Sequence, residues 1–436
     1  MDFEQIENFY TGSLLTLTET KQNKKVFWEK RIYNASNALE AELTSVQVYP
    51  SELRLIPNSN ASNAITGTVI DTQHPALRPF HAVRLVLANY DTSAAMTING
   101  ICAAGVSANA SNNGTGLAWV DGLMDGVNTS STPFSIPAAT TSGGQVRPTI
   151  RVTDVIDVFP VARTDVSNAP LLLRTRVHAS TGKGLNGNGG EFPNYNNHAS
   201  NPGLYYANGL LAGASSTLKT ASITPTNAVG PSNPIVVIGV IYYYDVDVPS
   251  ITVFGDSLFQ GVGDPAGTFA GWPSRLAWSM ATTGRPISCV NYAMSGQTIE
   301  DSYATAIQVL SQTQPRFAAW KPWSPNNLIT TQALADEYWQ KTLNFVDMCL
   351  KKGIVPIVLT SPTVNALSTV DYNRLVALNN KVLGLPSTVI KVNLANEFNN
   401  GEDLAANINS GDGTHLTAYA HNRAAELVKF EVMAYR

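Results

Sequence analysis

The sequence predicts an α/β domain over residues 248–436, preceded by a mainly antiparallel β-sandwich over residues 61–247. After Pro249, short apolar segments of strand type alternate with amphipathic segments of helical type. This alternation is typical of a parallel sheet covered by helices on both faces. Between Ala61 and Asp247, short strand-type runs follow one another with turn residues between them and without intervening helices. That pattern favours an antiparallel sandwich.

The strand-type runs of the sandwich alternate apolar and polar residues, as half-buried strands do. The clearest are Ala82–Leu87, Thr149–Val152, Pro170–Val177 and Pro234–Tyr244. Two stretches rich in glycine, asparagine and serine, Ala108–Gly144 and Ser180–Gly209, predict long loops. Loops of that length in a compact domain are either functional or mobile.

Residues 1–60 form a separate segment of mixed composition, and its role stays open. The amphipathic stretch Val26–Leu43 predicts that this segment is partly helical.

The α/β domain is predicted to contain five strands and five helices in strict alternation. The predicted strands are Ile251–Phe254, Ile287–Ala293, Arg316–Trp320, Val355–Thr360 and Val389–Leu394. The predicted helices are Ala270–Thr283, Glu300–Ser311, Thr331–Lys352, Asp371–Leu383 and Thr417–Met433. In such a sheet ligands bind beyond the carboxyl ends of the strands, so the loops after each strand are where functional residues are expected.

Composition excludes several classes of function. Charged residues make up only 14% of the 436 residues and the net charge is -4, which argues against nucleic-acid binding as the main function. The three cysteines are far apart, so neither a disulfide framework nor a cysteine-based metal site is expected. No apolar run is long enough to predict a membrane span. No secretory signal peptide is visible, so we expect a cytoplasmic, phage-particle or non-Sec exported protein.

The first predicted strand is followed by Gly255-Asp256-Ser257. A glycine at a strand end allows a sharp turn, and a serine just after it can present its hydroxyl at the carboxyl edge of the sheet. There it can lie near a helix N-terminus, whose N–H groups favour developing negative charge. Taken alone, the segment is better explained as a turn with a helix-capping residue.

Two further loops can supply hydrogen-bond donors. Gly296 follows the second predicted strand, and its backbone N–H is not obstructed by a side chain. Asn326 follows the third strand and carries a side-chain N–H, as does its neighbour Asn327. Both could stabilise an oxyanion. In isolation, each is also ordinary turn chemistry.

Ahead of the last predicted helix lies Asp412-Gly413-Thr414-His415. An Asp and a His three residues apart on a turn can join carboxylate to imidazole Nδ1, which directs Nε2 toward a hydroxyl. A capping Asp and a surface His are the alternative. The four signals follow successive strands of one predicted sheet, and together they supply a nucleophile, two oxyanion donors and an oriented base.

These segments resemble the four sequence blocks of the SGNH/GDSL hydrolases. The matching segments are Ile251–Gly261, Asn291–Gly296, Asn326 and Asp412–His415. The resemblance covers about residues 248–436 and implies a flavodoxin-like sheet with strand order 2-1-3-4-5. It implies Ser257 as nucleophile and His415 as base oriented by Asp412. It also implies an oxyanion hole made by the backbone N–H groups of Ser257 and Gly296 and the side chain of Asn326, with no cofactor and no metal.

The third block departs from the family pattern of Gly-x-Asn-Asp, because the chain has Ser324-Pro325-Asn326-Asn327. This puts the local loop geometry in question. Upstream, Val83–Tyr90 is similar to the β-sandwich that precedes the catalytic domain in some bacterial carbohydrate-active members.

The resemblance predicts a serine esterase that removes short acyl groups, above all acetyl, from a carbohydrate. Its expected partner is therefore an acylated small molecule or polysaccharide, and the oligomeric state stays open. Two alternatives are kept. The same site could serve a lipase, a thioesterase or an O-acetyltransferase. The chain could also be a phage or surface glycan-binding protein that carries an esterase domain.

Overall fold

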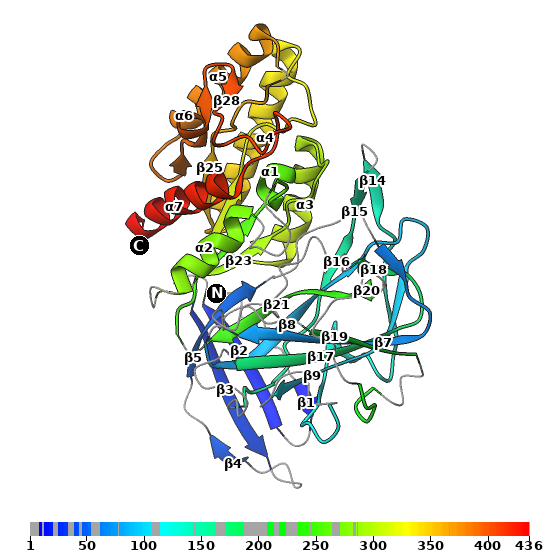
Figure 1. Ribbon diagram of the computed structural model, residues 1–436. Coiled ribbons are helices and arrows are strands. Elements are labelled where there is room, and N and C mark those ends of the chain that lie inside the picture. Colours follow the sequence, from blue (N-terminus) through cyan, green and yellow to red (C-terminus); the bar gives the residue numbers. More distant parts are fainter. Residues whose placement is uncertain are drawn as a thin grey trace.

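The computed structural model describes most of the chain (Figure 1). The described residues are 8–10, 13–20, 25–33, 39–42, 46–53, 62–76, 78–106, 114–142, 145–161, 171–186, 207–212, 218–223, 234–244, 246–263, 271–281, 285, 287–365 and 367–435. Figure 1 shows a helical C-terminal part beside a part built almost entirely of strands.

The C-terminal part contains one parallel sheet of five strands within the described residues. Its order is β23 (Ser288–Asn291), β22 (Ser250–Val253), β24 (Phe317–Trp320), β25 (Val355–Leu359) and β26 (Ile390–Val392). Nearly every residue of these strands is buried, which explains why they are short apolar runs without alternation. The predicted order 2-1-3-4-5 is confirmed, and β22 lies second from one edge.

Helices cover both faces of this sheet. Their bounds are α1 (Ser257–Gln260), α2 (Gly271–Ala281), α3 (Ile299–Gln312), α4 (Gln332–Lys351), α5 (Thr369–Leu383), α6 (Leu394–Phe398) and α7 (Ala418–Ala434). Residues of α2, α6 and α7 share one hydrophobic cluster with the sheet, and residues of α3, α4 and α5 share the other. The five predicted helices are confirmed to within a few residues, whereas the short helices α1 and α6 were not predicted.

The strand-rich part has two main sheets, as the sandwich prediction requires. One contains β1 (Asn8–Tyr10), β2 (Ser13–Thr20), β3 (Lys25–Tyr33), β4 (Leu39–Glu42), β5 (Val46–Leu53), β21 (Val237–Tyr244), β8 (Phe80–Asn89) and β16 (Thr149–Val152). The other contains β10 (Val120–Asp121), β9 (Met96–Val106), β13 (Phe134–Ile136), β17 (Leu171–Ala179), β7 (Thr68–Ala76) and β19 (Ala207–Ala212). Neighbouring strands in both sheets run antiparallel.

Short pairs of strands complete the fold. They are β11 (Leu123–Met124) with β12 (Val127–Asn128), β14 (Thr140–Ser142) with β15 (Gln145–Arg147), and β27 (Asn399–Asn400) with β28 (Asp403–Leu404). A small third sheet of the strand-rich part joins β6 (Ser62–Ala64), β18 (Lys183–Asn186) and β20 (Pro234–Ile235).

The helix predicted over Val26–Leu43 is wrong, because strands β3 and β4 lie there. The segment is rich in β-branched and aromatic residues, which favour strands. β3 also pairs with β2 on one side and β5 on the other, and such pairing overrides a local helical period. Because β5 pairs with β21, strands from both sides of residue 60 share a sheet. The domain boundaries at residues 60 and 247 stay predictions.

The two predicted loops are only partly loops. Ala108–Gly144 contains β10 to β14, and Ser180–Gly209 contains β18 and the start of β19. Residues 107–113, 143–144 and 187–206 lie outside the described residues. The short strands carry no periodic pattern, and they form because an existing strand offers free backbone groups, as where Val120 pairs with Ala103.

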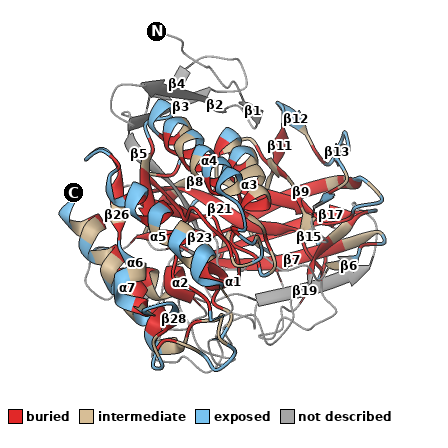
Figure 2. Ribbon diagram, turned by 90° about the horizontal axis from the view of Figure 1, so that it is seen from above, coloured by how far each residue is buried: buried red, intermediate tan, exposed pale blue. Residues whose placement is uncertain are grey.

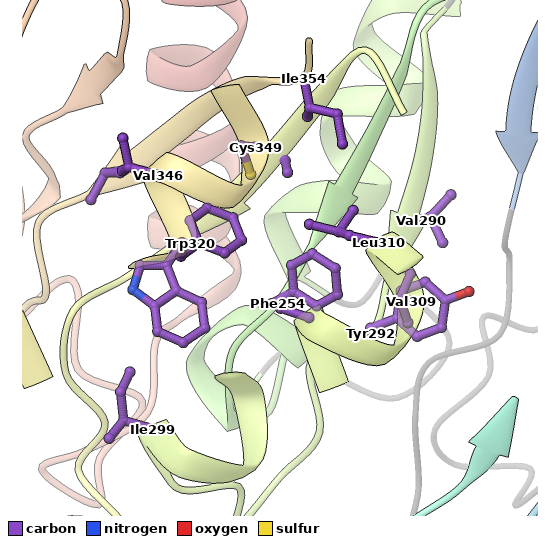
Figure 3. Packing of buried hydrophobic residues seen from close by; sticks show 14 of the residues in the cluster. Phe254, Val290, Tyr292, Ile299, Val309, Leu310, Trp320, Val346, Cys349 and Ile354 are labelled. Carbon is purple, nitrogen blue, oxygen red and sulfur yellow. The ribbon is translucent and has the colours of Figure 1, made fainter. Parts of the chain in front are cut away.

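One hydrophobic cluster joins the two parts of the molecule. It contains Val86 of β8 and Ile150 of β16 together with Val309 and Leu310 of α3. Figure 2 shows buried residues in the strands and on the inward faces of the helices, with exposed residues on the outer helix faces. The close-up in Figure 3 shows Phe254, Trp320 and Tyr292 within this cluster. The strand-rich part is therefore packed against α3 and is not a loosely tethered module.

Trp320 tests how much of the stability this cluster supplies. The ring is fully buried, stacks on Phe345 at 5.1 Å between centroids, and donates from Nε1 to Thr342 Oγ1 at 3.1 Å. We expect Trp320→Ala to lower the free energy of unfolding by about 3–5 kcal/mol. Urea unfolding followed by fluorescence and circular dichroism measures it. Phe430→Ala is the control, since Phe430 is 72% exposed, and a Trp320→Ala midpoint equal to that of the control would contradict the expectation.

Candidate active site

The chain turns sharply after β22, and Ser257 stands at the first position of α1. A Cβ on Gly255 would lie 2.9 Å from the ring of Phe259, so only glycine fits this turn without a shift. Asp256 is the N-cap, and its Oδ1 accepts the backbone N–H of Leu258 at 3.0 Å. The turn therefore holds the Ser257 hydroxyl at the carboxyl edge of the sheet, where the sequence predicted it.

Asp256 is fully buried and has a buried cation as its partner. Lys321 Nζ donates to its Oδ2 at 2.6 Å, and the two side chains are 2% and 0% exposed. Burial lowers the pKa of Lys321, and the neighbouring Asp256 carboxylate opposes that shift. Lys321 was not predicted from the sequence. The available signal was a lysine placed directly after the apolar strand β24.

His415 lies between Ser257 and Asp412. Its Nε2 is 3.0 Å from Ser257 Oγ, and its Nδ1 is 2.5 Å from Asp412 Oδ2. An ionised carboxylate can only accept, so Nδ1 carries the proton and Nε2 of the neutral ring is free to accept from the hydroxyl. The structure thus brings together the three side chains that the sequence singled out.

The Asp412 carboxylate is held in its ionised form by hydrogen bonds. Burial raises its pKa, but the backbone and ring N–H groups of His415 and the backbone N–H of Thr414 outweigh burial and lower the pKa overall. Oδ1 accepts both backbone N–H groups, from His415 at 2.8 Å and from Thr414 at 2.9 Å. The side chain is 51% exposed, so solvent also supports the charge.

The loop that carries Asp412 and His415 is closed by hydrogen bonds among its own residues. Asn409 Oδ1 accepts the N–H of Gly411 at 2.8 Å and that of Gly413 at 3.0 Å. Ser410 N–H donates to the carbonyl of His415 at 2.9 Å. Both glycines have positive φ, of 111° and 76°, a conformation that other residues rarely adopt. The geometry of the loop is therefore largely local.

Two residues from other loops support this loop, and neither was predicted from the sequence. Asn365, in the loop after β25, donates its backbone N–H to the carbonyl of Gly413 at 2.8 Å. Gly263, just after α1, approaches so closely that a Cβ there would lie 2.6 Å from the carbonyl oxygen of Leu416. The loop that carries Asp412 and His415 is thus in close backbone contact with the segment that carries Ser257.

Gly296 follows β23 and has a positive φ of 79°. The two residues before it are hydrogen-bonded to the segment that carries Ser257. Met294 N–H donates to Gly255 O at 3.2 Å, and Ser295 N–H donates to Gln260 Oε1 at 2.5 Å. Among the described residues, the backbone N–H groups of Ser257 and Gly296 donate to no acceptor. These two backbone N–H groups, which have no acceptor within the described part of the chain, therefore lie on segments that are hydrogen-bonded to each other.

Asn326 lies beside the Gly296 loop, but its amide hydrogens are already engaged. Nδ2 is 2.9 Å from the carbonyl of Gln297 and 3.2 Å from Ser324 Oγ. Asn327 has a different role, because its Oδ1 accepts the N–H of Ile299 at 2.7 Å, at the start of α3. The preference for Asn326 over Asn327 stays a prediction. To donate to an oxyanion, the Asn326 amide would have to rotate away from these two acceptors.

Residues 251–338 match the family model of the GDSL-like lipases and acylhydrolases. Over these residues the chain carries an SGNH/GDSL hydrolase domain. The family implies ester hydrolase activity and an acylated substrate. Asp412 and His415 lie beyond the matched residues, so their place in this SGNH/GDSL domain rests on the geometry described above.

Solved structures of the same class resemble this chain at low identity. A GDSL-like lipase from Bacteroides thetaiotaomicron is 12% identical and covers 43% of this chain and 89% of its own, with a TM-score of 0.35. A lipase/acylhydrolase from Enterococcus faecalis is 16% identical over 43% and 97%, with a TM-score of 0.35. An acetyl xylan esterase is 19% identical over 43% and 98%, with a TM-score of 0.34. No curated protein matches the chain.

The described residues contain no helix that is both long and apolar enough to cross a membrane. Within the same part of the chain, the His, Cys, Asp and Glu side chains form no group of three or more that could hold a metal ion.

Removing Lys321 should strongly destabilise the SGNH/GDSL domain. Lys321→Met leaves the Asp256 carboxylate buried without its cation partner, which we expect to cost about 3–5 kcal/mol of unfolding free energy. Urea unfolding measures it, with Lys381→Met as control because that lysine pairs with Asp336 at the surface. Adding Asp256→Asn to Lys321→Met should recover part of the loss. A double variant less stable than Lys321→Met would contradict the role assigned to the ion pair.

The lowered pKa of Asp412 predicts a specific dependence of stability on pH. The folded protein binds the proton less readily than the unfolded chain, whose carboxyl has the ordinary value of 3.8. Ionised Asp412 therefore stabilises the fold above that value, and this contribution is lost as pH falls through the lower folded pKa. The gap in urea midpoint between the wild type and Asp412→Asn should stay constant from pH 7 to about 5 and shrink below about 4. A gap that widens on acidification would rule this out.

Proposed function

We propose that the chain is a serine esterase in which Ser257 is the nucleophile, His415 the general base and Asp412 the residue that orients it. One observation carries the proposal: the unbroken line of contacts from Ser257 Oγ to His415 Nε2 at 3.0 Å and from Nδ1 to Asp412 Oδ2 at 2.5 Å. It lies at the carboxyl ends of the parallel strands, where such sheets bind ligands.

In the acylation step, Ser257 Oγ attacks the ester carbonyl while His415 Nε2 takes the hydroxyl proton. The resulting imidazolium is stabilised by Asp412, whose carboxylate is held ionised by surrounding N–H groups. The carbonyl oxygen becomes an oxyanion as the tetrahedral intermediate forms. His415 then returns the proton to the leaving alcohol oxygen as the C–O bond breaks, which leaves an acyl ester on Ser257.

The oxyanion needs donors that are not already bonded. The backbone N–H groups of Ser257 and Gly296 meet that requirement, because neither donates to an acceptor among the described residues. Asn326 would join as a third donor by turning its amide away from the Gln297 carbonyl, 2.9 Å distant. Each such donor typically contributes a factor of about 10²–10³ in rate. In the second half of the cycle, His415 activates a water molecule that releases the acid.

We further propose that the substrate carries a short acyl group, above all acetyl, on a carbohydrate. The Ser257 residue is only 3% exposed, which favours small acyl groups over long chains. The strand-rich part contacts the start of α3 through Arg147 and Asp301, near Gly296, so a polymer bound there would be held close to Ser257. A lipase, a thioesterase and an acetyltransferase on the same residues are the competing outcomes.

A panel of p-nitrophenyl esters and acetylated polysaccharides tests the proposal. We expect the highest kcat/KM for acetyl, a fall of at least about tenfold by octanoyl, and a loss of about 10³-fold or more in Ser257→Ala. Circular dichroism checks that Ser257→Ala is folded. Unchanged hydrolysis by Ser257→Ala would reject the esterase assignment. Rates that rise with chain length would indicate a lipase, and acyl transfer to an added sugar in preference to water would indicate a transferase.

A further inference from the structure

Helix α3 links the strand-rich part of the molecule to the proposed oxyanion loops. In Figure 1 the pair β14–β15 lies alongside α3, and the contact is direct. Near the C-terminal end of α3, Gln312 Nε2 donates to the carbonyl of Ile150 on β16 at 3.0 Å. Gly296 lies only three residues before the N-terminal end of the helix. A residue that fixes the N-terminal end of α3 therefore also constrains the loop that carries Gly296.

Asp301 fixes the N-terminal end of α3 and is fully buried. Its Oδ2 accepts the backbone N–H of Thr298 at 3.0 Å and the Thr298 hydroxyl at 2.8 Å, which completes a capping box. Its Oδ1 accepts from Arg147, the last residue of β15, through Nε at 2.7 Å and through Nη2 as well. The carboxylate thus joins a residue of the strand-rich part to the helix cap.

The capped end of α3 is where the two proposed donor loops meet. The carbonyl of Gln297 accepts from Asn326 Nδ2 at 2.9 Å and from Ser324 Oγ at 2.9 Å. The N–H of Ile299 donates to Asn327 Oδ1 at 2.7 Å. Any movement of residues 296–299 would therefore move the Gly296 N–H and the Asn326 amide together.

We propose that Arg147 is a positioning residue for the oxyanion loops, acting from the strand-rich domain through Asp301. The inference rests on the proposed function of the Ser257 site. Without Arg147, the Asp301 carboxylate is left buried with one oxygen unpaired, a state that is strongly unfavourable. Asp301 then rotates toward water to regain a partner for that oxygen, and the rotation breaks the bonds that its other oxygen accepts from Thr298. The loop that carries Gly296 loses its fixed geometry as a result.

Loss of Arg147 would leave the docking of the two domains intact. The Gln312 contact and the shared hydrophobic cluster of Val86, Ile150, Val309 and Leu310 hold α3 against the strands without it. The expected defect is consequently one of geometry at the helix start and not separation of the domains. This makes a positioning role distinguishable from a general structural role.

The kinetic test compares Arg147→Ala and Arg147→Lys with Arg151→Ala. Arg151 is the matched control because it lies on the neighbouring strand β16 and pairs with the exposed Asp125. We expect Arg147→Ala to lower kcat for p-nitrophenyl acetate by about 10–100-fold with KM within about twofold. Arg147→Lys should recover part of the loss, and Arg151→Ala should behave as wild type. A wild-type kcat in Arg147→Ala, or a loss that only follows the unfolded fraction, would overturn the proposal.

Hydrogen exchange provides a readout that needs no substrate. Amides of peptides covering residues 294–301 should exchange at least about tenfold faster in Arg147→Ala than in Arg151→Ala, while the β22 amides stay equally protected in both. Equal exchange at 294–301 would overturn the role of Arg147 even if the esterase is active. A different outcome is faster exchange in Arg147→Ala combined with equal ester hydrolysis by the wild type and Ser257→Ala. That outcome would reject the proposed function, but it would leave the link from Arg147 to Asp301 standing.

Discussion

The geometry at the sheet edge depends on the two contacts of the buried Asp256 carboxylate, one with the backbone N–H of Leu258 and one with Lys321. A helix of four residues such as α1 has too few hydrogen bonds to be stable by itself. Its start is fixed by Asp256, which accepts the N–H of Leu258, and its end by Gly261 in a left-handed conformation. The direction of the Ser257 hydroxyl follows from that cap. Lys321 in turn gives the second carboxylate oxygen a hydrogen-bond partner in a position that is closed to water.

Asp301 repeats this arrangement at the start of α3. In both cases one carboxylate oxygen accepts a backbone N–H at a helix start, while the other pairs with a cation from a distant segment. The difference lies in where the cation comes from. Lys321 belongs to the same domain as Asp256, whereas Arg147 belongs to the strand-rich domain. Ser257, the proposed nucleophile, is therefore fixed from within the C-terminal part, whereas the helix start that follows Gly296 is held from both parts.

The strands and helices of the C-terminal part could mostly be predicted from the sequence, whereas those of the remaining chain could be predicted less completely. Alternating strands and helices predicted a parallel sheet covered by helices, because its strands are apolar runs and its helices have a clear period. The order of the strands followed only from the resemblance to the SGNH/GDSL hydrolases. The segment Val26–Leu43 misled, since its apolar residues fit a helical period while its strand pairing is decided by β2 and β5. The short strands within Ala108–Gly144 could not be foreseen, because two or three residues hold no period at all.

The residues of the candidate site also differ in how far they could be predicted, according to whether their contacts are local or distant in the sequence. Asp412 and His415 are three residues apart, and their loop is closed by hydrogen bonds among its own residues, so a local pattern in the sequence was enough to find them. Asp412 stays ionised through N–H donors and partial exposure, and needs no distant partner. Buried Asp256 and Asp301 do need one. Their cations lie 65 and 154 residues away along the chain, and nothing local indicates either pairing. Burial of a carboxylate thus demands a partner that only the folded chain can supply, which is why sequence patterns singled out the proposed reacting groups and missed the residues that hold them in place.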